Sequence, residues 1–255
     1  MRKGIDISNW QAALTNFEGL RAAGIEFAII KITEGTTYKS PSFEKQYNGL
    51  RAAGIPVGVY IYTHASTREA VQNELTFALQ ALGTRKLQLP VFLDMEANGL
   101  TNYIEVALHF GECCTAAGLR WGIYANKFWW THYLDPTKIK AAGGAIWVAQ
   151  YNTCCGIESA DIWQYTNDGR LHGYSGAIDM NELLNPALIR NEEPPQPAAT
   201  TDTQSAAPRY DGKIAALQGI MYLDGYWEKT ANGIPTPEFC DCLKEYADAI
   251  KGNIK

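Results

Sequence analysis

The chain has 255 residues, of which 46% are hydrophobic and 19% are charged, and these proportions exclude a disordered or collagen-like protein. Its 22 Lys and Arg residues against 27 Asp and Glu residues give a net charge of −5, so the overall balance favours neither a nucleic-acid partner nor an anionic membrane. The longest apolar runs fall far short of the roughly 20 residues that span a bilayer, and we expect no membrane insertion.

The amino terminus predicts that the fold begins at once. Arg2 and Lys3 are followed by a short alternating stretch that contains Asp6, without the apolar core or the cleavage site of a signal peptide. We therefore expect a first strand over residues 4–7 and a protein made in the cytosol without an export signal of its own.

Eight apolar segments predict β-strands. They span residues 4–7, 27–33, 57–62, 91–95, 121–124, 146–150, 162–165 and 177–180. The gaps among the first strands have room for crossover helices, including an amphipathic helix over 68–82, whereas the last two gaps are short and rich in turn residues. This spacing predicts an α/β fold, an irregular TIM-like barrel of five βα units followed by three further strands.

A change of composition divides the chain after the predicted barrel. Residues 190–209 are rich in Pro, Ala and Thr and lack large apolar side chains, which is typical of a linker. We expect a barrel domain over 1–189 and a small helical domain over 210–255.

Cysteine and histidine residues show no spacing that is typical of a metal site. The six cysteines occur at 113–114, 154–155, 240 and 242, and the four histidines form no ligand pattern. We expect reduced thiols, no metal and no cofactor.

Carboxylates follow several of the predicted strands, where barrels of this kind build their active sites. They are Asp6, Glu34, Asp94, Glu96 and Asp179. Asp94 and Glu96 are two residues apart on a strand and share a face, so their like charges raise the proton affinity of one of them. A proton-holding carboxyl beside an ionised one suits general acid catalysis of glycoside cleavage, although the pair alone also fits a surface acid pair or a metal site.

Aromatic and polar side chains accompany these carboxylates at the predicted strand ends. The expected substrate-binding residues are Tyr62, Glu34, Tyr124, Gln150, Trp163 and Tyr165. Flat aromatic faces beside acids favour a saccharide substrate, while core packing accounts for part of the aromatic content. Lys31 lies on the second predicted strand, where we expect an ion pair with a rim acid rather than a Schiff base.

Eight short motifs occur in a fixed order between residues 3 and 189. They are Gly4-Ile-Asp6-Ile-Ser-Asn-Trp10, Ile30-Lys-Ile-Thr-Glu34-Gly35, Gly58-Val-Tyr-Ile-Tyr62, Val91-Phe-Leu-Asp94-Met-Glu96, Gly122-Ile-Tyr124, Ile146-Trp-Val-Ala-Gln-Tyr151, Trp163-Gln-Tyr165 and Ile178-Asp179-Met-Asn181. In this order they resemble the lysozymes of glycoside hydrolase family 25, the Chalaropsis-type muramidases. The resemblance implies hydrolysis of the β-1,4 bond between N-acetylmuramic acid and N-acetylglucosamine in peptidoglycan.

The resemblance also implies roles for individual residues. Glu96 matches the general acid and Asp94 its partner, Asp6 and Asp179 match two further cleft carboxylates, and Tyr62 matches a cleft tyrosine. The group that attacks the anomeric carbon is either a carboxylate or the substrate's own acetamido group. We favour the acetamido group because the substrate carries an N-acetyl group and because Asp94 and Glu96 form an adjacent Asp-x-Glu pair.

The tail is similar to small helical peptidoglycan-binding modules, and its alternative reading is a pair of docking or dimerisation helices. With no signal peptide, the two domains predict a bacteriophage endolysin. Such an enzyme stays in the host bacterial cytoplasm until a holin releases it to the cell wall, here expected to be Gram-positive. A bacterial autolysin of the same chemistry, a glycosidase that cuts another bond and a non-catalytic wall-binding barrel are the alternatives.

Overall fold

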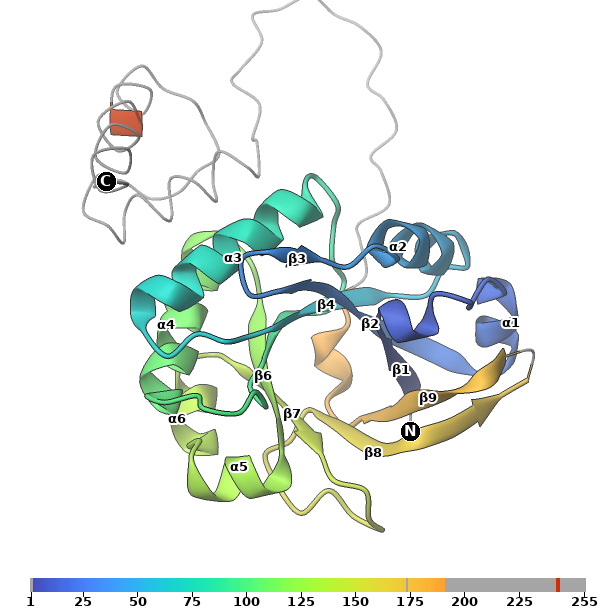
Figure 1. The fold of residues 1–255 in the computed structure, drawn as a ribbon. Helices are drawn as coiled ribbons and strands as arrows, with labels where there is room; N and C mark the ends of the chain where they lie inside the picture. Colours follow the sequence, from blue (N-terminus) through green and yellow to red (C-terminus); the bar gives the residue numbers. More distant parts are fainter. Residues whose placement is uncertain (1, 173, 191–241, 244–255) are drawn as a thin grey trace, which may run out of the picture. The chain divides into compact units, whose positions relative to one another are not determined.

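The computed structural model describes residues 2–172, 174–190 and 242–243 (Figure 1). The predicted linker and nearly all of the predicted helical domain lie outside the described residues. Residues 2–111 and 120–190 belong to one compact unit, which contains the predicted barrel. No helix in the described part of the chain is long and apolar enough to cross a bilayer.

Strands and helices alternate along this unit. The strands are β1 (Arg2–Ile7), β2 (Ile25–Glu34), β3 (Tyr38–Lys39), β4 (Val57–Tyr62), β5 (Val91–Asp94), β6 (Trp121–Asn126), β7 (Ala145–Ala149), β8 (Ile162–Leu171) and β9 (Tyr174–Leu183). The helices are α1 (Phe17–Ala22), α2 (Phe43–Ala52), α3 (Arg68–Leu82), α4 (Tyr103–Ala116), α5 (Lys127–His132) and α6 (Pro136–Ala141), with short 3-10 helices η1 (Asn9–Gln11) and η2 (Pro186–Leu188).

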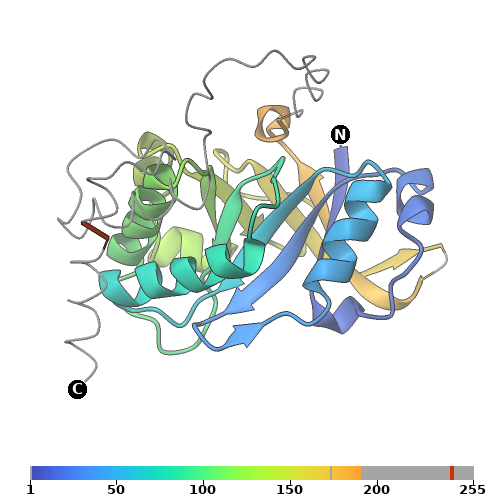
Figure 2. The same ribbon diagram turned by 90° about the horizontal axis from the view of Figure 1, so that it is seen from above.

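Eight of the strands close into a barrel in the order β1, β2, β4, β5, β6, β7, β8, β9 and back to β1. Neighbouring strands are parallel from β1 to β8, whereas β9 is antiparallel to both β8 and β1. The helices pack along the outside of the barrel (Figures 1 and 2). The predicted barrel of five βα units and three further strands is therefore confirmed.

The structure differs from the predicted strands in two places. Strand β3, which pairs antiparallel with the end of β2, was not predicted because it has two residues. Strands β8 and β9 are ten residues each and form a hairpin, so the predicted loop after Tyr165 is wrong. Residues 166–170 are polar or small and partly or fully exposed, and they lack the apolar alternation that identifies a half-buried strand in a sequence.

Local sequence features fix the ends of the helices. The Thr67 hydroxyl accepts a hydrogen bond from Ala70 N at the start of α3, and Gly83 follows its last residue with a φ of 64°. Gly24 and Gly54 follow α1 and α2 with φ of 85° and 69°. These positive φ angles suit glycine, which has no Cβ to clash with the carbonyl of the turn.

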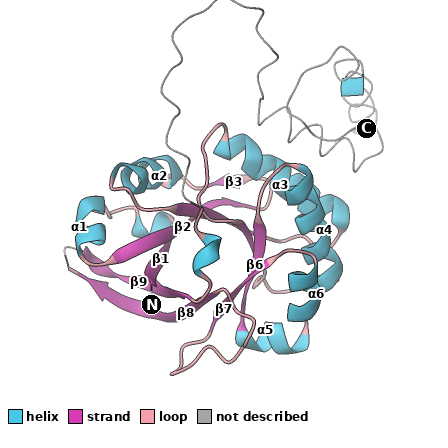
Figure 3. Ribbon diagram, turned by 180° about the vertical axis from the view of Figure 1, so that it is seen from behind, coloured by secondary structure: helices cyan, strands magenta, loops and turns pink. Residues whose placement is uncertain are grey.

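The interior of the barrel is apolar at the end where the parallel strands begin. Its buried side chains come from alternate positions of the strands and include Phe27, Ile29, Phe92, Trp147 and Ile162. Helix η2 lies across this end of the barrel (Figure 3), and its last residue, Leu188, packs against the same cluster together with Ile189. Because this end is filled, the space for a substrate lies at the other end, where the parallel strands finish.

Candidate active site

The same alternation carries polar side chains to the carboxyl ends of the parallel strands. The inward-facing residues at this rim are Asp6, Lys31, Tyr62, Asp94, Tyr124, Gln164 and Asp179. Asp94 lies between Tyr62 and Tyr124 in the strand register. Asp6 lies directly opposite Asp179 across the β1–β9 pair. The barrel therefore gathers residues that are far apart in the sequence into one polar rim.

Asp6 and Asp179 form a carboxyl pair. Asp6 is 5% exposed, and its Oδ2 accepts hydrogen bonds from Gln164 Nε2 at 2.8 Å and Asn181 Nδ2 at 2.7 Å. Burial raises the pKa of Asp6, against the effect of these hydrogen bonds. Burial and then the charge of Asp6 raise the pKa of Asp179 to about 8. At neutral pH the pair therefore holds one proton, because two close carboxylates do not both ionise.

Asp94 is the last residue of β5 and is 4% exposed. Its Oδ1 is buried and has no hydrogen-bond partner among the described residues. Burial and then the charge of Glu96 raise the pKa of Asp94 well above its usual range, while Lys31 acts in the opposite direction. A buried carboxyl oxygen without a partner is costly, so this atom is a candidate acceptor for a substrate hydrogen bond.

Glu96 follows the strand and is exposed at the rim. Partial loss of solvent and then the charge of Asp6 raise its pKa, with Lys31 opposing the shift. The next residue back, Met95, is fully buried, as expected when Asp94 and Glu96 share a face and Met95 points away. A carboxyl group that keeps its proton and is accessible to a ligand can serve as a general acid.

Gln164 joins several of these residues. Its Oε1 accepts hydrogen bonds from the hydroxyls of Tyr124 at 3.0 Å and Tyr151 at 2.9 Å, while its Nε2 donates to Asp6. Asn181, the other donor to Asp6, accepts a hydrogen bond from Trp147 Nε1 at 2.8 Å. The amides orient the Asp6 carboxylate, because each is itself held by an aromatic donor.

Asn181 and Tyr151 were not among the predicted site residues, whereas Gln164 was expected at a strand end without an assigned role. Asn181 lies two residues after Asp179 on β9, so its position on the same face was a usable signal. The role of Gln164 depends on the strand register opposite it, which the sequence does not reveal.

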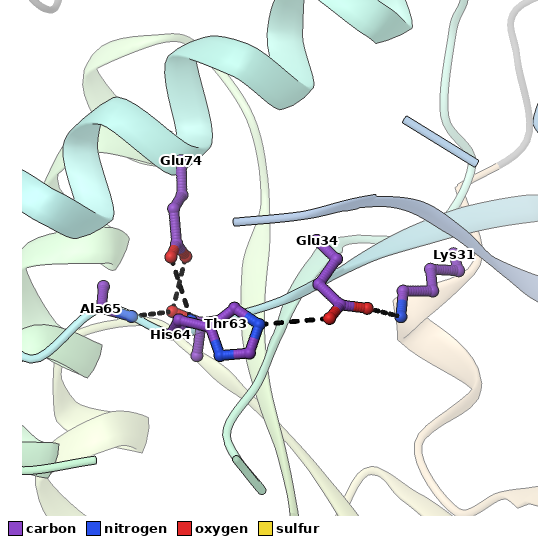
Figure 4. A network of polar contacts seen from close by, with 6 residues as sticks. All are labelled: Lys31, Glu34, Thr63, His64, Ala65 and Glu74. Carbon is purple, nitrogen blue, oxygen red and sulfur yellow. Dashed lines mark hydrogen bonds and ion pairs between the residues drawn. The ribbon is translucent and has the colours of Figure 1, made fainter. Parts of the chain in front are cut away.

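A second polar network includes Lys31, Glu34 and His64 (Figure 4), and the ring of Tyr62 contacts both Lys31 and His64. Lys31 Nζ lies 2.5 Å from Glu34 Oε2 and 4.6 Å from the centre of the Tyr62 ring, and His64 Nε2 lies 3.2 Å from Glu34 Oε1. Partial burial raises the pKa of Glu34, but hydrogen bonds from Lys31 and His64 outweigh it and leave that pKa below its usual value. The predicted ion pair of Lys31 with a rim acid is confirmed, and Glu34 is an ionised acceptor rather than a proton donor.

The structure does not bring all the predicted residues into this group. Gln164 faces inward on β8, so its neighbours Trp163 and Tyr165 lie on the opposite face of the strand. Tyr165 lines a pocket outside the barrel, together with Lys3. Gln150 contacts this group through backbone hydrogen bonds. Its N donates to Gln164 O at 3.0 Å, and its O accepts from Trp163 Nε1 at 2.7 Å. Substrate binding by these three residues stays a prediction.

A closed α/β barrel whose carboxyl rim carries several carboxylates and tyrosines, among them an exposed glutamic acid with a raised pKa, is the framework of a glycoside hydrolase. The comparison with protein families agrees, since the model for glycosyl hydrolases family 25 matches residues 5–174. The chain belongs to this family.

Individual lysozymes and endolysins are also similar to this chain. Lysozyme M1 of Streptomyces globisporus is 29% identical over 198 residues, which are 71% of this chain and 67% of the relative. The catalytic domain of endolysin ply40 from bacteriophage P40 of Listeria monocytogenes is 28% identical with a TM-score of 0.60, over 72% of this chain and 93% of that domain. The CTP1L endolysin shares the fold at 24% identity and a TM-score of 0.64, and the chain covers 66% of it. The predicted class, a glycoside hydrolase of the muramidase type, is confirmed.

Proposed function

We propose that this enzyme cleaves the β-1,4 bond between N-acetylmuramic acid and N-acetylglucosamine in bacterial peptidoglycan, with Glu96 as the general acid. One observation carries the assignment. Glu96 is exposed at the rim and its pKa is raised, while the neighbouring Asp94 is buried and offers an unpartnered oxygen. Together they supply a proton and an orienting acceptor on the same side of a bound sugar.

The first step breaks the bond between the anomeric carbon and the glycosidic oxygen. Glu96 gives its proton to the departing oxygen, while the acetamido oxygen of the same sugar attacks the anomeric carbon. The acetamido N–H donates to Asp94 Oδ1, which turns the group toward the anomeric carbon and favours the ionised form of Asp94. Water then opens the cyclic intermediate, and Glu96 takes back a proton from that water.

Asp6 and Asp179 stabilise charge electrostatically and neither donate a proton nor attack the sugar. Their shared proton leaves one negative charge at the rim, held in place by Gln164 and Asn181. A preorganised negative charge stabilises the positive character that develops on the sugar ring in the transition state.

The test is mass spectrometry of borohydride-reduced fragments from purified peptidoglycan, digested in parallel by the wild type and by Glu96→Gln. Reduced muramic acid ends from the wild type alone support the proposal. Glucosamine ends would assign another bond, and intact strands from both proteins would indicate a non-catalytic wall-binding barrel. EDTA in a parallel digestion checks the expectation that no metal is required, since strong inhibition would reopen the metal-site interpretation of the acid pair.

We also propose that the enzyme is a bacteriophage endolysin for a Gram-positive wall, released from the host cytoplasm by a holin. The similarity to an endolysin catalytic domain supports this role, together with the predicted wall-binding domain over 210–255, nearly all of which lies outside the described residues. A bacterial autolysin would use the same chemistry. A holin gene beside the coding sequence would favour the endolysin, and a bacterial cell-wall operon there would favour the autolysin.

A further inference from the structure

An aromatic platform lies on the surface at the start of α4 and along α5. It consists of Tyr103, Phe128, Trp129, His132 and Tyr133, whose rings contact one another. Tyr103 and Tyr133 stack with ring centres 4.8 Å apart, and Phe128 stacks on His132 at 4.1 Å. Trp129 lies edge-on to both tyrosines at 5.2 and 5.7 Å. Phe128 is 55% and Tyr133 42% exposed, so the platform faces solvent.

Packing of the barrel does not account for this platform. The residue that anchors α5 is Trp130, which is 1% exposed and donates from Nε1 to Trp147 O at 3.2 Å. Phe128 and Tyr133 remain exposed and take no part in that buried contact. An exposed cluster of large aromatic side chains on an otherwise polar surface marks a binding site more often than chance exposure does.

The platform is continuous with the catalytic rim. Helix α5 begins directly after β6, the strand that carries Tyr124, and Asn126 caps it by accepting from Trp129 N at 3.0 Å. Tyr103 begins α4 after the segment 97–102, which follows Glu96. That segment is tied to the loop after β4, since Asn102 Nδ2 donates to Ser66 O at 2.9 Å. The platform therefore stands on the same side of the barrel as the carboxylates.

We propose that the aromatic platform is a saccharide-binding site for sugar units of the glycan strand beyond those at the catalytic carboxylates. This inference rests on the proposed function. Aromatic rings offer apolar faces to the C–H faces of a sugar, and the tyrosine hydroxyl and indole N–H groups at their edges suit its hydroxyl groups. A long glycan that enters the cleft must leave it over the rim, and the platform lies where β5 and β6 end.

The test compares substrates of different length in the full chain. Tyr133→Ala and the double variant with Phe128→Ala should cleave a short soluble glycan at the wild-type rate and lose about tenfold in kcat/KM on long uncrosslinked strands. Leu184→Ala is the matched control, because Leu184 is also exposed, at 40%, but follows the antiparallel β9 at the opposite end of the barrel. An equal effect on both substrates, or on neither, would overturn the inference.

A separate measurement tests whether something other than a saccharide binds to the platform. Analytical ultracentrifugation of the wild type and the double variant tests whether a second copy of the chain binds to the platform. A dimer that is lost on substitution would overturn the saccharide assignment. Unchanged cleavage of the short substrate shows that the variants fold. If the wild type cleaves neither substrate, the proposed function fails, whereas cleavage without any dependence on the platform refutes only this inference.

Discussion

At the scale of single residues, the site depends on which carboxyl groups keep their protons. Asp6 is held by two amide donors and shares a proton with Asp179, Asp94 is buried beside Glu96, and Glu34 is neutralised by Lys31. The pKa is therefore raised for four acids of the rim, Asp6, Asp94, Glu96 and Asp179, and lowered for the fifth, Glu34. The differences arise from burial and from specific partners, and they separate a proton donor from the groups that orient and stabilise.

Replacement of Glu96 by Gln should abolish lysis and leave wall binding intact, because it removes the proton donor with little change in volume. We expect a loss of about 100- to 10,000-fold in kcat. In the wild type kcat/KM should fall as the pH rises through the pKa of Glu96, which lies above its ordinary value of 4.5. Turbidity assays of wall suspensions between pH 4 and 9 measure both effects, and a variant that retains activity would disprove the role of Glu96.

The proton on Asp179 predicts a pH-dependent stability. Its pKa is 3.8 in an ordinary environment and about 8 in the folded chain. Between these values the unfolded chain releases the proton and the folded chain keeps it, so the free energy of unfolding should fall as the pH rises from about 4 to about 8. Asp179→Asn should remove part of this pH dependence, because an amide can donate a hydrogen bond to Asp6 but does not titrate in this pH range. Thermal unfolding at pH 4.5 and 7.5 tests this, and an unchanged pH dependence in the variant would contradict it.

At the scale of secondary-structure elements, strong local signals predicted the structure well. Helix α3 spans Arg68–Leu82 as predicted, since a capping threonine precedes it and a left-handed glycine ends it. The outer parts of β8 and β9 were missed because their stability comes from pairing with each other and not from a buried face. Trp163 and Tyr165 were expected in the cleft because nothing in the sequence says which face of β8 points inward. That choice is made by the neighbouring strands, as is the role of Gln164.

Close packing of the strands makes a glycine of β1 indispensable. A Cβ atom on Gly4 would lie 2.3 Å from the Phe27 ring, which fills the interior across the β1–β2 pair. Gly4→Ala should lower the free energy of unfolding by about 1–3 kcal/mol, the usual range for overpacking. Denaturant titration measures the change. The double variant with Phe27→Leu should recover part of it, and failure to do so would point to a backbone cause instead.

At the scale of the whole molecule, the tail is expected to raise the concentration of the barrel on its substrate. Deletion of residues 205–255 should weaken sedimentation with intact walls and leave cleavage of soluble fragments nearly unchanged. Equal wall binding before and after deletion would instead favour the docking or dimerisation interpretation of the tail. Full-length protein carrying Glu96→Gln is the control, since it separates binding from degradation of the wall.

Barrel closure has a consequence for the order of events during synthesis. The first strand carries Asp6, and the strand that completes the barrel, β9, carries Asp179 and Asn181, with Asn181 and Asp6 separated by 175 positions in the chain. Contacts between such distant segments form late in folding, because the loop between them must close first. A nascent polypeptide on the ribosome thus lacks the Asp6 environment until β9 has emerged. The catalytic residues come together only when the barrel is complete, so we expect incomplete translation products of the barrel to lack activity on the wall.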